Sequence, residues 1–370
     1  MSMEKTKEPI VRISKRASIG AWRAWLIRIA ALFASLVVCG VIIFGLTGLN
    51  PVAVYVAMFN GAFSTVNRTW VTVRDLMLLL CIGVGLAPAF KMRFWNIGAE
   101  GQILVGGIAT AACMIYLGKT LMNFQLPLLL IMIAASALAG AVWGLIPAIF
   151  KARWNANETL FTLMMNYIAI QFTSYFVALW ENPFGSNTVG IINQMTKSGW
   201  FPPIFKQMYL LNVLIVVALA AAMYLYLRYS KQGYEIAVVG ESENTARYAA
   251  INVKKVVIRT MILSGAICGI AGFLAVAGMS HTISTGTAGG RGFIAIIVAW
   301  LAKFNTLVMA LISGLLVFLD KGAIQIASQF DLNDFVSEMI MGIILCFILG
   351  SEFFINFKVH FRGKHKEDGK

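Results

Sequence analysis

Long apolar runs are the feature that most constrains this chain. Ten of them are spread over 370 residues, and several are about as long as the ~20-residue helix that crosses the hydrocarbon core of a bilayer. Hydrophobic residues make up 59% of the chain and charged residues only 12%, against about 25% charged in a soluble domain. A soluble globule of this size has too little interior to bury so much apolar surface. This composition therefore excludes a cytosolic enzyme, a disordered protein and a nucleic-acid-binding protein.

The runs predict an all-α polytopic membrane protein with ten transmembrane helices. Two of the runs are short for a straight crossing of the bilayer. The first run exceeds the 7–15-residue core of a signal peptide, so we expect a retained signal-anchor helix. The expected spans are 24–46, 75–90, 100–117, 127–150, 159–180, 209–228, 258–279, 292–303, 305–320 and 335–357.

The basic residues predict the orientation. With both termini in the cytoplasm, 23 of the 30 Lys and Arg residues lie on the inner side, as basic residues in short loops of membrane proteins do. The net charge of +14 therefore indicates a cytoplasmic excess of positive charge and no nucleic-acid partner. We expect a cytoplasmic segment at 1–23, a transmembrane domain at 24–357 and a cytoplasmic basic tail at 358–370.

Three connections are long enough to matter. Residues 47–74 and 181–208 are expected outside, the second with short surface helices around its prolines. The polar connection 229–257 is expected inside. We predict a helix near 243–251 within it, capped by Ser242 or Asn244, because Ser and Asn side chains satisfy the free N–H groups that begin a helix.

Two glycine-rich segments break the apolar pattern, at 94–102 on the inner side and at 284–293 on the outer side. Each follows the first helix of a four-helix group, helices 2–5 and 7–10. Groups that begin on opposite sides form an inverted repeat, and such repeats hold the solute near the midplane beside broken helices. The alternative is that both segments are ordinary tight turns, where glycine permits close helix packing.

Polar residues at the first break are candidates for solute binding. Asn96, Glu100 and Gln102 stand at the start of an apolar helix, and an ionisable group there is a functional hypothesis by default. Alternatively, Glu100 only stabilises the positive N-terminus of that helix. Asn166 lies within a span, so it either binds another helix or lines a path.

Aromatic and glycine residues complete the candidates. Trp95 and Trp300, together with Phe94, either stack on a planar ligand or belong to the aromatic belt at the membrane surface. The segments 140–144 and 265–269 both have glycine at each end, four residues apart. This small-xxx-small spacing favours close packing between helices.

Catalytic and metal-binding patterns are absent from the sequence. Five cysteines lie singly inside apolar runs and three histidines are scattered, so we expect no disulfide, metal site or cofactor. Residues 117–120 resemble the end of a P-loop, but Cys113 stands where that motif requires glycine. No chain of acidic residues and histidines follows the spans, as proton-driven carriers need. We therefore predict a protein that is not an enzyme.

Four motifs give the chain a family resemblance. The segment Phe94-Trp-Asn-Ile-Gly-Ala-Glu-Gly-Gln102 is similar to the Phe-Asn-Ile-Gly-x-Glu-Gly-Gln signature of bacterial ABC-importer permeases for nucleosides and simple sugars, in the branched-chain amino acid/ribose permease superfamily. Residues 157–169, 239–251 and 290–302 resemble three further stretches of that family. The chain departs from them at Thr245, Ala250, Ala295, Trp300 and Ala302, and the last three changes place bulk near the presumed pathway.

The resemblance, which runs from about 75 to 350, implies a mechanism. Two permease subunits, in the nucleoside branch usually different but similar chains, form the pore. A separate cytoplasmic ATPase energises it, and an external binding lipoprotein delivers the solute. The loop 229–257 would dock on the ATPase through Gly240, Glu241, Asn244, Arg247 and Tyr248. The solute path would be lined by the following residues: Trp95, Asn96, Glu100, Gln102, Asn166 and Trp300.

The leading interpretation is a nucleoside importer permease of the bacterial plasma membrane. A simple-sugar importer, of the ribose or galactose type, is the alternative within the class, since ribose is common to both kinds of solute. Outside the class, the alternatives are a secondary nucleoside carrier and a membrane enzyme or receptor.

Overall fold

The computed structural model describes residues 11–16, 20–331 and 334–361. The chain divides into two compact units. Unit 1 combines Met1–Ser64 with Phe318–Lys370, and unit 2 is the continuous segment Thr65–Val317.

The predicted all-α architecture is confirmed. Two short strands, β1 (Val11–Lys15) and β2 (Phe357–Phe361), pair antiparallel. The helices are α1 (Ala21–Thr47), α2 (Pro51–Phe63), α3 (Val66–Lys91), α4 (Ala99–Leu117), α5 (Gln125–Trp154), α6 (Glu158–Leu179), α7 (Leu210–Tyr229), α8 (Lys231–Glu241), α9 (Glu243–Tyr248), α10 (Val253–Ala275, continued by the π-helical turn η1, Val276–Ser280), α11 (Arg291–Leu301), α12 (Thr306–Gln329) and α13 (Asp334–Asn356).

Eight helices of the described chain are long and apolar enough to cross a membrane. They correspond to the predicted spans except for the runs at 292–303 and 335–357, which fall on the shorter apolar helices Arg291–Leu301 and Gly342–Ile355. At 1.5 Å per residue, the 11-residue helix α11 is about 16 Å long, roughly half of the ~30 Å hydrocarbon core.

The prediction of a loop over 47–74 is wrong. Helix α2 begins at Pro51, whose fixed φ suits a first helical position, and Asn50 caps it by accepting the N–H of Val52. Helix α3 begins at Val66, nine residues before the predicted span, after the cap residue Thr65. Helix α2 is apolar but only 13 residues long, and α3 begins with polar residues, so a search for apolar runs of span length overlooks both segments.

The connection between α6 and α7 contains no helix, contrary to the prediction of short surface helices. It consists of turns with positive φ at Gly185, Gly190 and Gly199. Asn193 holds it against the end of α4 by donating to the Met114 carbonyl at 2.7 Å, and within the connection the Trp200 indole donates to the Ile192 carbonyl at 2.9 Å. Prolines and left-handed residues prevent a continuous helix here.

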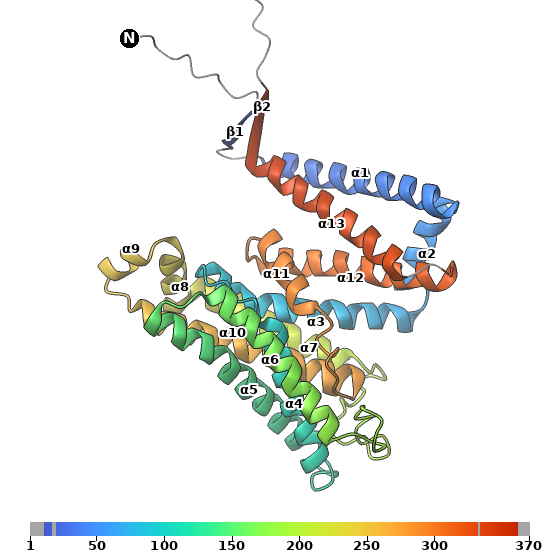
Figure 1. The fold of residues 1–370 in the computed structure, drawn as a ribbon, viewed down its shortest axis with the longest axis vertical. Coiled ribbons are helices and arrows are strands. Elements are labelled where there is room, and N and C mark those ends of the chain that lie inside the picture. The colour runs from blue at the N-terminus through green and yellow to red at the C-terminus, as the bar shows by residue number, and fades with distance from the viewer. Residues whose placement is uncertain (1–10, 17–19, 332–333, 362–370) are drawn as a thin grey trace, which may run out of the picture. The chain divides into compact units, whose positions relative to one another are not determined.

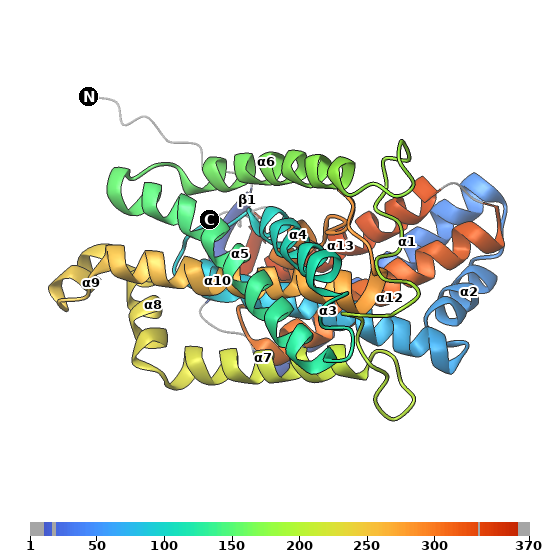
Figure 2. The same cartoon turned by 90° about the horizontal axis from the view of Figure 1, so that it is seen from below.

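Helices α8 and α9 occupy the connection that was predicted at 229–257. The predicted helix near 243–251 is found as α9, and Ser242 rather than Asn244 caps it, accepting the N–H of Thr245 at 3.3 Å. Helix α8 was not predicted. It is capped by Ser230, which accepts the N–H of Gly233 at 2.9 Å. Figure 2 shows α8 and α9 joining the ends of α7 and α10.

The centre of unit 2 is the contact of α10 with α4 and α5, which run alongside it in Figure 1. Glycines bring the helix backbones together. A Cβ atom on Gly140 would lie 2.2 Å from the Gly265 carbonyl, and one on Gly106 would lie 2.4 Å from the Gly269 carbonyl. The predicted small-xxx-small packing is therefore confirmed, and the two segments pack against each other.

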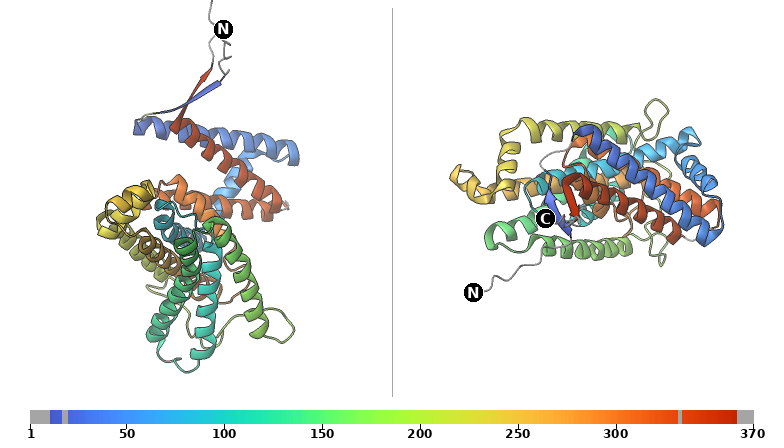
Figure 3. Two further views of the ribbon diagram at one scale, coloured as in Figure 1. Left: turned by 60° about the vertical axis from the view of Figure 1, so that its left-hand side comes forward. Right: turned by 90° about the horizontal axis from the view of Figure 1, so that it is seen from above.

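In unit 1, α1 packs along α13, and β1 pairs with β2 beyond the ends of these helices (Figure 3). Arg28 of α1 donates to Glu352 of α13 at 2.8 Å. Within the same unit, a Cβ atom on Gly322 of α12 would lie 2.9 Å from the side chain of Met58 in α2.

Candidate functional site

The first glycine-rich break is an irregular segment between α3 and α4. Helix α3 contains Pro88, which has no N–H to continue the ladder, and the chain leaves the helix at Arg93, whose φ is +61°. The N–H of Phe94 then bonds the Ala89 carbonyl at 3.0 Å. Phe94 is buried, while Trp95 is 42% exposed. The break therefore turns one ring inward and presents the next at the surface.

Asn96 organises the inner side of this break. It is fully buried, and its side-chain oxygen accepts the N–H of Gly98 at 3.0 Å. Its amide nitrogen lies 3.3 Å from the Ser264 hydroxyl and 3.4 Å from the Gln102 oxygen. A buried amide is costly without partners, so this network fixes the loop that joins α3 to α4 against α10.

Helix α6 supplies a second set of bonds to the same break. The Asn166 oxygen accepts the N–H of Gly101 at 2.9 Å, and its nitrogen donates to the Ile97 carbonyl at 2.9 Å. The Thr162 hydroxyl accepts the N–H of Ile97 at 3.1 Å. Asn166 thus binds another element of the bundle, and its buried side chain replaces the helical partners that the break lacks.

Glu100 joins the two glycine-rich breaks. One carboxylate oxygen accepts the N–H of Gly290 at 2.6 Å, and the other accepts the N–H of Gly292 at 2.8 Å. These N–H groups lie at the N-terminus of α11, where the helix dipole favours negative charge. Only glycine fits at 292, because a Cβ atom there would lie 2.6 Å from the Glu100 nitrogen. The Glu100 carboxylate therefore stabilises the N-terminus of α11 as well as the first turn of its own helix, α4.

Two tryptophans stack at the surface beside this contact between the two breaks. The rings of Trp95 and Trp300 stack with their centroids 5.1 Å apart and an angle of 25° between their planes. Phe90 meets both rings edge-on, at 5.8 and 6.2 Å. Trp300 is 47% exposed. The pair offers a half-exposed aromatic surface next to the buried polar network.

The predicted solute-path residues are thus brought together in unit 2, but in two environments. Asn96, Glu100, Gln102 and Asn166 are buried and bonded to the backbone or to each other, whereas the two tryptophans are half-exposed. In this conformation, of these six residues only the two tryptophans have half-exposed side chains.

The residues predicted to contact the ATPase lie on or beside α8 and α9, and Gly240 among them meets the end of α3, where the first break begins. Gly240 is buried, and a Cβ atom there would lie 2.1 Å from the Lys91 carbonyl, so α8 lies directly against the end of α3. Glu241 and Asn244 are exposed. Tyr248 is 93% exposed, and Arg247 forms a loose ion pair with Glu243 at 3.6 Å. Four of the five predicted residues therefore do not lie in the core.

One apolar cluster connects α9 with the first break. Ala246 of α9, Ile236 and Val239 of α8, and Met92 and Phe94 of the break are buried in it together. Helix α9 is short and has few bonds of its own, so its position depends on this cluster.

A basic groove of about 610 Å³ lies beside α9. It is lined by the end of α5, by α9 and by the start of α10, and its basic side chains are Lys151, Arg153, Arg247 and Lys254. Lys151 is paired with Glu158 at 2.9 Å. The groove carries a net positive charge, which suits an acidic partner.

Sequence reasoning missed Thr162, Ser264 and the basic side of the groove. Thr162 and Asn166 are four residues apart, which places them on one face of a helix and was an available signal. Ser264 directly precedes the first glycine of the 265–269 packing motif and carried no signal of its own. Over the described residues, no three His, Cys, Asp or Glu side chains form a group that suits a metal ion.

Comparison with known proteins identifies related sequences. The family described as "Branched-chain amino acid transport system / permease component" matches residues 69–349. The guanosine ABC transporter permease protein NupP of Bacillus subtilis is 31% identical over 336 residues, which cover 89% of this chain and 93% of that protein. No solved structure matches this chain significantly.

Two further relatives differ in the solute that their names give. The glucose ABC transporter permease protein TsgB13 of Haloferax volcanii is 29% identical, with 94% of this chain and 93% of that protein covered. The nucleoside ABC transporter permease protein NupB of Lactococcus lactis is 26% identical, with 71% of this chain and 74% of that protein covered.

Proposed function

We propose that this chain, which belongs to the permease-component family of branched-chain amino acid transport systems, forms the membrane path of an ABC importer for nucleosides. Its helices, long and apolar enough to span a bilayer, make it a multi-pass membrane protein, and its relatives are transport components rather than enzymes.

The observation that carries the proposal is the joint between α9 and the first break. The exposed side chains Arg247 and Tyr248 stand on a short helix whose Ala246 shares an apolar cluster with Phe94. Phe94 directly precedes the tryptophan that stacks on Trp300. A force on α9 therefore acts on residues that adjoin the proposed solute path.

Helix α9 is proposed to dock on the ATPase, with the basic groove beside it receiving acidic side chains. Under this proposal the α9 end of unit 2, the N-terminal segment and the basic tail are cytoplasmic. The connection between α6 and α7 is then external, where a binding lipoprotein delivers the solute. Its exposed apolar side chains, among them Phe184, Met195 and Phe205, support contact with a protein on that side.

Nucleosides are favoured by NupP and NupB, whose names give guanosine and nucleosides as their solutes. The stacked pair Trp95 and Trp300 supports a solute with a planar base, because aromatic faces bind planar rings. The path is proposed to pass the exposed faces of this pair, while Asn96, Glu100, Gln102 and Asn166 shape its wall. A second, similar permease completes the pore.

A simple-sugar importer is the second candidate, and one observation favours it. TsgB13, a glucose permease by name, covers nearly all of this chain. Uptake of radiolabelled guanosine, uridine and glucose, measured in cells with and without the gene and with and without ATP depletion, separates the two. We expect ATP-dependent nucleoside uptake to disappear with the gene and to be unaffected by excess ribose. Loss of glucose uptake alone would refute the nucleoside assignment.

The coupling proposal has its own test. Arg247→Glu reverses the charge of an exposed side chain on α9, so we expect it to abolish solute-stimulated ATP hydrolysis by the assembled complex without lowering expression. Lys231→Glu, at the start of α8 and outside the groove, is the matched control and should hydrolyse ATP normally. Normal stimulation in the Arg247 variant would show that α9 is not the ATPase contact.

A further inference from the structure

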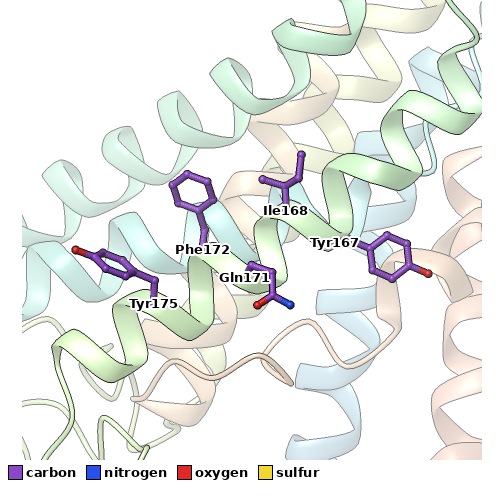
Figure 4. Close-up of a pocket in the computed structure, with 5 residues that line it drawn as sticks. All are labelled: Tyr167, Ile168, Gln171, Phe172 and Tyr175. Carbon is purple, nitrogen blue, oxygen red and sulfur yellow. The ribbon is translucent and has the colours of Figure 1, made fainter.

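Helix α6 presents hydrogen-bonding side chains on a face that no other helix of the described chain covers. Tyr167 is 60% exposed and Tyr175 is 64% exposed, and Gln171 between them is also exposed. The three residues are spaced four apart, so they follow one another along one face. With Ile168 and Phe172 they form an open surface to which α6 alone contributes side chains (Figure 4).

This polar face lies at the middle of the helix. Helix α6 has 22 residues and is about 33 Å long, so Gln171 lies about 20 Å from one end and about 12 Å from the other. Aromatic residues of a membrane-surface belt are expected at helix ends, as with Trp180, whose indole donates to the Tyr116 hydroxyl at 3.0 Å. Tyr167 and Gln171 are too central for such a belt.

The exposed faces of the neighbouring helices are different. Along α5 the large exposed residues between its ends are aliphatic, such as Leu130, Leu138 and Val142. Along α7 they are Leu214, Val217 and Leu225. These faces match a lipid environment. The exposed face of α6 therefore differs from those of α5 and α7, although all three helices are long and apolar enough to span a membrane.

Lipid contact does not suit Gln171. Transfer of an unpaired amide into an apolar medium is costly, and irregular or unpaired polar groups at membrane depth are tolerated only beside protein or water. No residue of the described chain bonds the Gln171 amide. The face must therefore meet something other than hydrocarbon.

We infer that the Tyr167–Gln171–Tyr175 face of α6 lines the water-filled path of the solute and contacts the nucleoside directly. Gln171 offers one acceptor and two donors to the base or the ribose, and each tyrosine lies about 6 Å away along the helix axis, close enough to stack on the same solute. This inference rests on the proposed function, whose solute it places on α6.

Thiol accessibility in the assembled complex tests the path. Gln171→Cys and the control Val217→Cys are made in a background with Cys113→Ser and Cys346→Ser, because the remaining native cysteines, Cys39, Cys81 and Cys268, are buried. The cysteine thiolate, which forms in water and not in lipid, attacks the sulfenyl sulfur of a charged methanethiosulfonate reagent, forms a mixed disulfide and releases methanesulfinate. Each unit by which the pKa of a thiol rises lowers its thiolate fraction about tenfold, so we expect labelling at 171 to exceed labelling at 217 by at least that factor.

Protection by solute separates the inference from the function on which it rests. Slower labelling of Gln171→Cys in the presence of guanosine supports both. Protection by glucose, with none by guanosine, supports the path on α6 and refutes the nucleoside assignment. If Gln171→Cys is labelled no faster than Val217→Cys, or if no solute slows its labelling, the inference about α6 is wrong. The nucleoside function is then tested by the uptake experiment alone.

Uptake by conservative variants gives a second, independent measurement. Tyr167→Leu removes a stacking surface and Tyr167→Phe keeps it, so guanosine uptake should fall with a raised KM in the first and stay near normal in the second. A role in folding alone would lower the amount of protein in the membrane and leave the KM unchanged. Equal KM values in Tyr167→Leu and the parent would count against solute contact.

Discussion

The carboxylate of Glu100 is predicted to hold the start of α11 in place, and Glu100→Gln tests this with almost no change of shape. In the parent, each carboxylate oxygen accepts one N–H, from Gly290 at 2.6 Å and from Gly292 at 2.8 Å. The amide of glutamine keeps one acceptor oxygen. Its NH2 group then faces the other N–H, donor against donor, and leaves that backbone group without a partner.

The cost follows from these two bonds. Replacing a charge-assisted bond, worth about 1.5–3 kcal/mol, by a neutral one of about 0.5–1.5 kcal/mol loses roughly 1–2 kcal/mol. Leaving the second N–H buried and unpaired adds about 1–3 kcal/mol. Glu100 is only 8% exposed and Gly292 approaches it closely, so water has little room to replace the lost partner. We therefore expect a loss of about 2–5 kcal/mol.

Thermal unfolding of the detergent-solubilised protein measures this loss. At roughly 2–4 °C per kcal/mol, the factor for a 150–250-residue domain, the midpoint should fall by about 4–20 °C. Glu243→Gln is the matched control, since Glu243 is also an acidic residue in the first turn of a helix but its side chain is 56% exposed. An exposed pair contributes about 0–1 kcal/mol. Equal midpoints for the two variants would refute the role assigned to Glu100.

Two further predictions concern packing and pH. Gly140→Ala should lower the yield of folded protein sharply, because its Cβ would lie 2.2 Å from the Gly265 carbonyl, whereas Gly45→Ala, with open space around it, should be tolerated; size-exclusion profiles of both variants check this. Burial lowers the pKa of His281, whose ring stacks on that of Trp200 with the centroids 3.8 Å apart. A backbone hydrogen bond opposes this shift, and a nearby arginine adds to it. Because the unfolded imidazole binds protons more readily, the stability of the loop is fully present above pH ~6.5 and falls as the pH decreases below it. Amide-exchange protection of residues 180–209, corrected for intrinsic rates, should therefore decrease at acidic pH in the parent and stay constant in His281→Gln.

Local features of the fold could be predicted from the sequence. Apolar runs gave the long helices, the glycine spacing at Gly140 and Gly265 gave a helix contact, and Ser242 marked the start of α9. Each of these depends on residues within a turn or two of one another. Helix α8 escaped because its polar residues reduce the apolar signal, and α2 escaped because its apolar run of 13 residues is shorter than a membrane span, although Asn50 and Ser230 are ordinary cap residues.

The candidate site was predictable only in its parts. Asn96, Glu100 and Trp300 were selected as separate residues, but the bond from Glu100 to Gly290 joins positions 190 residues apart, and no local pattern states such a pairing. The exposed face of α6 was missed for a related reason. The alternation of Asn166, which turns inward, and Tyr167, which turns outward, is visible in the sequence, but which face stays uncovered depends on the packing of the other helices.

The close glycine contacts of α5 with α10 have a mechanical consequence. Where backbones touch without intervening side chains, neither rotation nor sliding is possible without a clash, so α4, α5 and α10 move as one rigid body. Any opening and closing of the path within unit 2 then has to come from elements outside this body. The short helix α11 packs on α3, and N–H groups at its start donate to the Glu100 carboxylate, so it lies outside these three helices. We therefore expect the choice between glycine and larger residues at a few positions to decide which helices form the frame and which move against it.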